Sequence, residues 1–165
     1  MKTKWYLLGL TIIPWISIPF MDKHSIKRFL PVSILMGILL IGESLVARKK
    51  VWWWIYKKPH PKIMGETPLI LGPYIVGSMW MLRFGFGNIL RYSILNLFVH
   101  FIFVYVLMDW FKSIGYWSLV RLKKYQLLLL FIIEAIILYV TQLIFELIKK
   151  SNLNHSHQNV DKSKL

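Results

Sequence analysis

The 165-residue chain contains no cysteine and only seven acidic residues. Without cysteine it can form no disulfide, no thiolate metal site and no Cys nucleophile, and it cannot attach haem covalently. Walker loops, HExxH sequences and Ser-His-Asp arrangements are also missing from the sequence. We therefore expect no enzymatic activity, no cofactor and no bound metal.

Hydrophobic residues make up 56% of the chain, whereas a water-soluble domain has roughly 45–50%. They are concentrated in long runs, and about 20 apolar residues suffice to cross a hydrocarbon core of roughly 30 Å. The predicted spans are residues 5–21, 29–47, 67–82, 89–111 and 125–148. The sequence thus predicts an all-α membrane protein, a bundle of about five transmembrane helices in one domain (1–148). We expect the polar tail, 149–165, to be disordered.

The net charge is +14, and most of the basic residues lie between the apolar runs. In that position they meet anionic lipid headgroups and influence orientation. The expected partners are therefore the lipid bilayer and its anionic headgroups, in a multi-pass protein of the cell membrane. Nucleic-acid binding is not expected, because no soluble basic domain remains outside the spans. Either a membrane-protein partner or a homo-oligomer is compatible with this prediction.

The third apolar run, residues 67–82, leaves the topology open between five spans and four. Its lack of charge favours a true span, and the positive-inside rule then weakly favours a cytoplasmic N-terminus. If this run re-enters instead, four spans remain and the charge bias between the two sides becomes stronger. We adopt five spans and keep four as the alternative.

A tryptophan-rich segment follows the second predicted span. Aromatic side chains with a polar edge favour the headgroup level of a membrane. The sequence therefore predicts a segment that lies in the membrane interface, anchored by Trp52, Trp53, Trp54, Lys57 and Lys58.

Several polar side chains fall at membrane depth, where a charge costs about 2.5–3.5 kcal/mol on insertion scales. The candidate intramembrane polar site consists of Glu43, Asn96, His100, Glu134 and Gln142. In the five-span topology Glu43, His100 and Glu134 share one slab of the membrane, whereas with four spans the two carboxyl groups lie on opposite sides of the midplane. Glu134 lies nearest the centre among apolar neighbours, and we expect it to be uncharged unless it faces water or His100.

These polar groups admit two interpretations. In the first they form a protonatable site, with Glu43 and Glu134 as proton carriers and His100 as a relay. In the second they are interhelical hydrogen-bonding groups whose role is structural, which is common in membrane bundles and contributes about 0.6 kcal/mol per contact. The sequence reasoning favours the structural interpretation.

Five short motifs lie within residues 5–148. They are Lys27-Arg28-Phe29-Leu30-Pro31, Glu43 in the second run, Trp52-Trp53-Trp54 through Pro61, Gly65-Glu66-Thr67-Pro68, and Trp80 through Asn88. In this spacing the chain resembles small multi-pass membrane proteins of spore-forming Gram-positive bacilli, a group with no assigned activity. The resemblance implies a plasma-membrane location and about five helices, and it implies no catalytic residue.

Two functions follow as hypotheses. The absence of catalytic motifs favours a non-enzymatic accessory or partner-binding membrane protein. The alternative is a small proton-coupled transporter or channel that uses Glu43, His100 and Glu134. A structure in which these three side chains line one cavity would favour the alternative.

Overall fold

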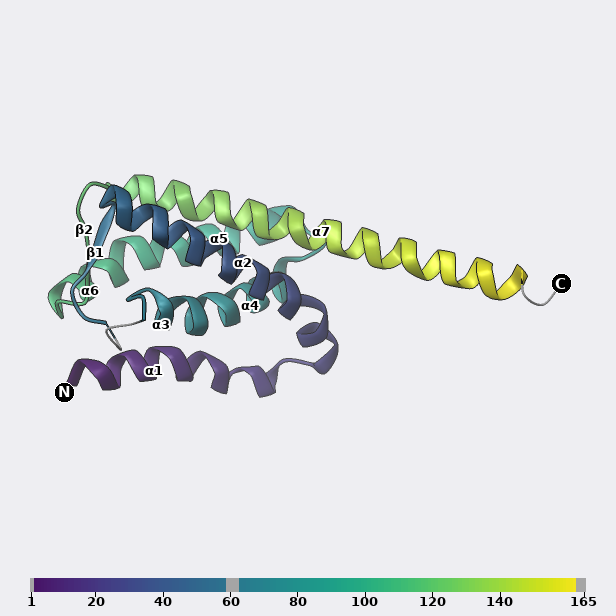
Figure 1. Cartoon of the computed structure of the whole chain (residues 1–165), viewed down its shortest axis with the longest axis horizontal. Helices are drawn as coiled ribbons and strands as arrows, with labels where there is room; N and C mark the ends of the chain where they lie inside the picture. Colours follow the sequence, from purple (N-terminus) through teal and green to yellow (C-terminus); the bar gives the residue numbers. More distant parts are fainter. Residues whose placement is uncertain (1, 59–62, 163–165) are drawn as a thin grey trace.

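The computed structural model describes residues 2–58 and 63–162. Over these residues it confirms the predicted all-α bundle, with five helical segments. The segments are α1 (Lys2–Ile16) with η1 (Ile18–Phe20); α2 (Lys23–Lys50); α3 (Thr67–Leu69), η2 (Ile70–Tyr74) and α4 (Ile75–Gly85) in one run; α5 (Ile89–Ile102), η3 (Phe103–Leu107) and α6 (Met108–Ser113) in another; and α7 (Lys124–Lys162). They lie lengthwise beside one another (Figure 1).

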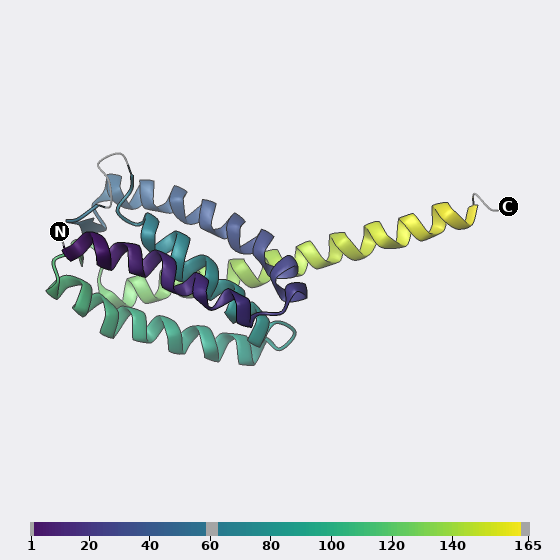
Figure 2. The same cartoon turned by 90° about the horizontal axis from the view of Figure 1, so that it is seen from below.

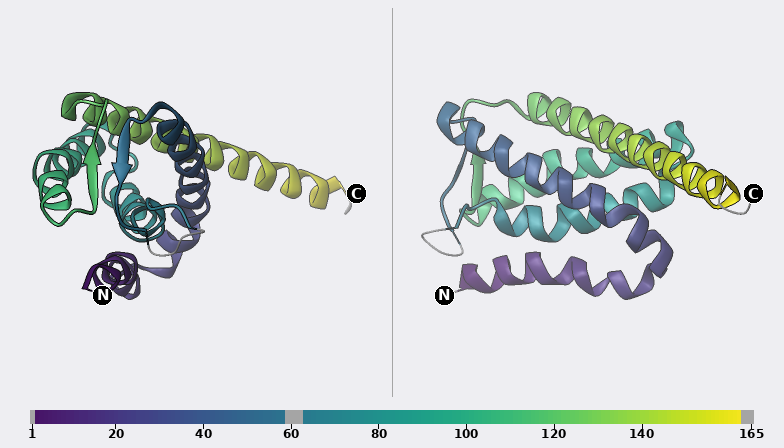
Figure 3. Two further views of the ribbon diagram at one scale, coloured as in Figure 1. Left: turned by 60° about the vertical axis from the view of Figure 1, so that its left-hand side comes forward. Right: turned by 45° about the vertical axis from the view of Figure 1, so that its right-hand side comes forward.

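Four of the segments form a closed ring. Helix α2 packs against α4, α4 against α5, α5 against α7, and α7 returns to α2. Helix α1 lies outside this ring against α3, η2 and α4 (Figure 3, left). Its approach is close because Gly72 has no side chain: a Cβ there would lie 2.4 Å from the Leu10 carbonyl oxygen. The Trp15 indole also donates to the Leu71 carbonyl oxygen, at 2.9 Å.

Local sequence signals set the ends of the ring helices. Asp22 caps α2 by accepting a hydrogen bond from the Ser25 amide at 2.8 Å. Asn88 caps α5 in the same way, accepting from the Arg91 amide at 3.0 Å. At its other end α2 finishes on basic residues 48–50, which complement the partial negative charge of a helix C-terminus.

Two ring segments contain a π-helical turn. In η2 the turn includes Pro73, whose ring nitrogen carries no hydrogen and cannot continue the α-helical ladder. In η3 no proline is present. Such wider turns shift the side chains that follow them and are frequent at functional sites. Both turns here contribute side chains to the interior of the ring, Tyr74 from η2 and Phe103 from η3.

A two-stranded antiparallel ribbon crosses one end of the ring (Figure 3, left). It pairs β1 (Trp53–Ile55) with β2 (Trp117–Leu119), and Trp53 lies opposite Leu119. The tryptophan segment therefore differs from the interfacial segment that the sequence predicts. The alternation of a strand turns Trp53 and Ile55 inward and leaves Trp54 outward, 54% exposed.

Three helices are long and apolar enough to cross a membrane, namely 23–50, 89–113 and 124–151, and residues 5–20 form a shorter apolar helix. The protein is therefore membrane-embedded. The run from α3 to α4 does not turn back on itself but extends from the ribbon end of the bundle to the α4–α5 turn (Figures 1 and 2).

Helix α7 continues well past the other helices (Figures 1 and 2). Its 39 residues correspond to about 58 Å, nearly twice the thickness of a hydrocarbon core. The backbone is helical as far as Lys162, where the sequence predicts a disordered tail from residue 149.

Candidate functional site

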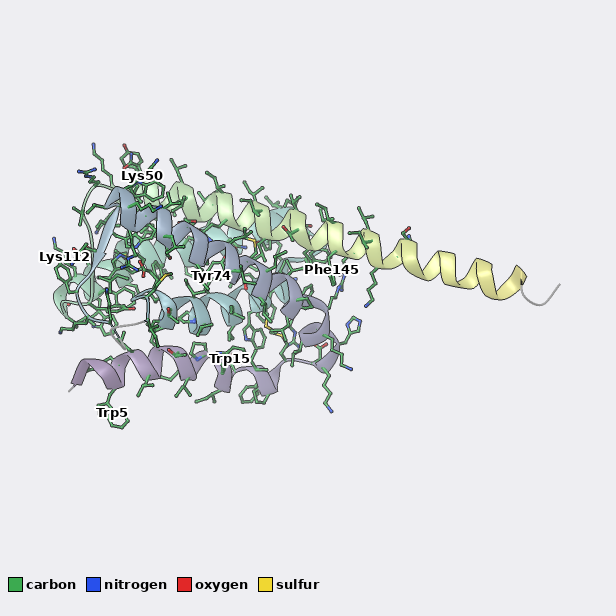
Figure 4. All side chains as sticks on the ribbon, viewed as in Figure 1. Trp5, Trp15, Lys50, Tyr74, Lys112 and Phe145 are labelled. Carbon is green, nitrogen blue, oxygen red and sulfur yellow. The ribbon has the colours of Figure 1, made fainter. Side chains whose placement is uncertain are left out.

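A partly open cavity of about 190 Å³ lies between the helices of the ring. Its walls come from α2, the α3–α4 run, α5 with η3, and α7, while the ribbon contributes Trp53 and Trp117 at one end. Most of the lining side chains are aliphatic or aromatic. Tyr74, which lines the cavity, lies in the middle of the bundle (Figure 4).

Two carboxyl groups from different helices line this cavity. Glu43 projects from α2 and is half-buried, and Glu134 projects from α7 and is 6% exposed. They lie close enough to interact side chain to side chain. No donor within the described residues reaches either oxygen of Glu134. A hydrogen bond between two carboxyl groups requires a proton on one of them, because carboxylates only accept.

Helix α5 places Asn96 and His100 on the same wall, one turn apart. The side-chain nitrogen of Asn96, Nδ2, donates to the Tyr92 carbonyl oxygen at 2.8 Å. The His100 ring lies 5.3 Å from that of Phe131, centroid to centroid, and its Nε2 has no hydrogen-bond partner in the described chain. His100 Nε2 thus joins both Glu134 oxygens as polar atoms of the cavity wall without a partner in the described chain.

Four of the five predicted intramembrane residues thus converge on one cavity: Glu43, Asn96, His100 and Glu134. The fifth is placed elsewhere, which corrects the sequence-based grouping. Gln142 is 0% exposed, and its Nε2 donates to Glu146 Oε1 at 3.1 Å and to the Arg28 carbonyl oxygen at 3.5 Å. Two helical turns along α7 separate it from Glu134, so it lies at the opposite end from the ribbon.

An ion pair between α2 and α7 occupies that opposite end. Arg28 binds Glu146 through two nitrogens, with Nη2 at 2.9 Å from Oε2. The guanidinium also lies 5.2 Å from the Phe29 ring and 5.0 Å from the Phe86 ring. This pair could not be predicted from the sequence, because 118 positions separate its members and no local pattern joins them.

The ribbon end of the cavity carries an indole–carboxyl hydrogen bond. Trp53 Nε1 donates to Glu66 Oε1 at 2.9 Å, and Glu66 is 6% exposed. Trp117 lies edge-on to Trp53, with ring centroids 5.7 Å apart, and its own Nε1 has no partner among the described residues. Sequence reasoning missed Glu66 and Trp117. The lone carboxylate before an uncharged run of apolar residues was the available signal for Glu66.

The predicted interfacial anchors separate into buried and exposed groups. Trp53 is 5% exposed and belongs to the cavity wall, so it is not an interfacial anchor. Trp52 is half-buried beneath Lys50, whose Nζ lies 5.8 Å from the ring. Trp54 and Lys58 are exposed, and exposed Lys57 donates from Nζ to the Ile114 carbonyl oxygen at 3.1 Å.

A tyrosine outside the apolar helices fixes the ribbon to the start of α3. The Tyr116 hydroxyl donates to the Gly65 carbonyl oxygen at 2.7 Å. Burial, with a smaller contribution from the charge of Glu66, raises the pKa of the Tyr116 phenol above its usual value. Gly65 itself passes under Ile55, where a Cβ would lie 2.4 Å from the side chain. The ribbon is therefore held at a fixed position across the ring.

The charge of the cavity is one-sided. Among its described lining residues are Glu43, Glu66 and Glu134, and none is Lys or Arg. Basic side chains such as Lys50 and Lys112 lie at the ribbon end of the bundle instead (Figure 4). Over the described residues no cluster of three or more His, Asp or Glu side chains is arranged to hold a metal ion. The cavity is thus acidic within largely apolar walls.

No protein-family model, curated protein or solved structure matches this chain. A function for this protein is therefore inferred from the geometry of the cavity alone.

Proposed function

We propose that the protein is a small proton-coupled transporter whose site is the cavity of the four-helix ring. The observation that carries this proposal is that half-buried Glu43 and buried Glu134 line one cavity, whose described wall contains no lysine or arginine. The sequence left an accessory protein and a transporter as alternatives. The convergence of Glu43, His100 and Glu134 on one cavity supports the transporter.

Coupling follows from the charge of the pair. Ionised carboxylates in an apolar interior need compensation, and this wall provides no fixed cation. A proton on the pair or a mobile cation beside it supplies that compensation. Because either the proton or the cation compensates the charge, binding of the cation releases the proton, and binding of the proton releases the cation.

The proposal includes a topology of five membrane crossings in the cell membrane, with the N-terminus in the cytoplasm. The lengthwise run of residues 67–85 supports a crossing at this position over a re-entrant loop. In this topology the ribbon closes the cavity toward one side of the membrane. The closely packed helix ends that include the Arg28–Glu146 ion pair lie toward the other, so that transport requires the two ends to open in turn.

Exchange of a cation for a proton is tested in proteoliposomes that contain a pH-sensitive dye. Vesicles loaded with sodium, potassium or tetramethylammonium chloride are diluted into medium without that cation. Outflow of a transported cation drives proton entry, and we expect the lumen to acidify with at least one of the three. Tetramethylammonium is informative because its permanent charge prevents it from crossing lipid unaided.

The variants Glu43→Gln and Glu134→Gln keep the side-chain shape but cannot exchange a proton, and we expect them to abolish acidification. The matched control is Asp109→Asn, which removes an exposed carboxylate paired with Lys124 outside the cavity. It should acidify like the wild type. Absence of acidification with all three cations, or equal acidification in the two glutamine variants, overturns the proposed function.

A further inference from the structure

We propose that the cavity recognises a small apolar organic cation, a protonated amine of roughly the size of a substituted benzene ring. This inference rests on the proposed function for the role of the ligand as transported substrate. Its binding chemistry stands on the cavity alone. The carboxyl pair Glu43 and Glu134 provides the counter-charge, and aromatic walls provide the contact surface.

The sign of the ligand follows from the polar atoms of the cavity. Both Glu134 oxygens lack a hydrogen-bond donor in the described chain. The described residues that line the cavity include no lysine or arginine. An ammonium group provides donors and a positive charge together, which a neutral alcohol does not. An anion would face three carboxyl-bearing side chains, Glu43, Glu66 and Glu134.

The apolar character of the ligand follows from the rest of the wall. Indole rings from Trp53 and Trp117 and the phenyl ring of Phe131 line the same cavity as the carboxyl pair. Aromatic faces attract organic cations and tolerate their alkyl surface. A bare inorganic ion needs a shell of several oxygen ligands in place of its water, and largely apolar walls do not supply that shell.

The size of the ligand follows from the volume. An apolar cavity of about 150 Å³ in an unrelated protein holds one benzene molecule. The cavity here, about 190 Å³, leaves room for a ring and an amino-methyl group. It is smaller than the roughly 300–1,000 Å³ of pockets that accept drug-sized molecules.

Binding exchanges one positive charge for another. The other titratable groups that line the cavity with the carboxyl pair are Tyr74 from η2, His100 from α5 and Glu66 before α3. None of them is a fixed cation. The entering ammonium therefore displaces the proton held by Glu43 and Glu134 into bulk water, and the charge in the cavity stays constant.

The test uses three ligands of nearly one shape: benzylammonium, benzyl alcohol and benzoate. Each is titrated into the detergent-purified full-length protein by isothermal calorimetry near neutral pH. We expect benzylammonium to bind about tenfold or more tightly than benzyl alcohol, because only the ammonium forms a charge-assisted hydrogen bond to the pair. Benzoate should not bind. The heat of benzylammonium binding should also vary with the ionisation enthalpy of the buffer, because a proton is released.

Two glycines offer a matched pair of filling variants. A Cβ at Gly77 or at Gly42 would meet nothing within 4 Å, but only Gly77 lines the cavity. Gly77→Leu should weaken benzylammonium binding by about tenfold or more, and Gly42→Leu should bind like the wild type. Glu43→Gln should remove the preference for benzylammonium over benzyl alcohol while benzyl alcohol still binds, a result that a loss of folding would not give.

Equal affinity for benzylammonium and benzyl alcohol, or undiminished binding in Gly77→Leu, overturns the inference. The two proposals fail separately. Binding of benzylammonium without any cation-driven acidification keeps the ligand class and overturns transport. Acidification with sodium or potassium but not with tetramethylammonium, together with no benzylammonium binding, keeps transport and overturns the ligand class.

Discussion

The two ends of the helical ring are built on different principles. Toward the α4–α5 turn the helices touch closely: Met79 and Leu82 are fully buried, and the Tyr92 hydroxyl donates to the Ala135 carbonyl oxygen at 2.8 Å. Toward the ribbon a second packed cluster, which includes Phe111 and Tyr116, borders the cavity, and Trp117 and Glu134 keep polar atoms without partners in the described chain. Because Ser33 Oγ and Gln142 Oε1 also lack partners among the described residues, the cavity rather than the unpartnered atoms distinguishes the two ends.

The largest effect is expected from Gly85 at the packed end. A Cβ at this position would lie 2.6 Å from the Tyr92 Cα, and a backbone atom cannot move aside easily. Gly85→Ala should lower the free energy of unfolding by about 3 kcal/mol. Gly42→Ala is the control, because it adds the same methyl group in open space and should stabilise α2 by about 0.5–1 kcal/mol. Tryptophan fluorescence during thermal unfolding in detergent measures both, and equal melting of Gly85→Ala and wild type would contradict the comparison.

A smaller effect is expected at the join between the ribbon and α3. Tyr116→Phe removes the hydroxyl that donates to the Gly65 carbonyl oxygen and leaves that oxygen buried without a donor. We expect a loss of about 1–2 kcal/mol. Tyr125→Phe removes a hydroxyl from an exposed side chain and should change the unfolding midpoint little. If the two variants melt alike, the ribbon is not held by this hydrogen bond.

At Glu134 the expected change in stability has the opposite sign. Glu134→Leu replaces a carboxyl group without donors by an apolar group, and it should leave stability unchanged or raise it by about 1 kcal/mol. Glu134→Gln should fold and melt like the wild type. Both variants should lose cation-driven acidification of proteoliposomes. A clear destabilisation by leucine would instead support the structural interpretation, in which Glu134 holds helices together.

The smallest effect concerns Asp22, an exposed side chain at the start of α2. The Ser25 amide, followed by the Ser25 side chain and Arg83, holds the pKa of Asp22 below its usual value. Its stabilising contribution is therefore present above the unfolded pKa of about 3.9 and is lost as pH falls through the lower folded value. Asp22→Asn keeps the cap but not the charge. The small difference in melting temperature between Asp22→Asn and wild type should vanish as pH is lowered through this range, and a difference independent of pH would contradict the assignment.

The helices were predictable from the sequence because each one is a predominantly apolar run between charged or glycine-rich turns. The polar residues at membrane depth were predictable for the same reason, since Glu43 and Glu134 stand out against apolar neighbours. Their meeting was not predictable, because it depends on which helices pack together. Trp53 was assigned to the interface because its partner strand, residues 117–119, lies far away in the sequence. Gln142 was grouped with Glu134, whereas it lies two turns further along the same helix and donates to Glu146 one turn beyond itself.

Helices α2 and α7 meet through polar groups at two levels, the carboxyl pair Glu43–Glu134 and the ion pair Arg28–Glu146. Along each helix the two levels are about 20 Å apart, and an α-helix over that distance behaves as a stiff rod. A displacement of α2 relative to α7 at the carboxyl pair would therefore be carried along both helices to the Arg28–Glu146 contact.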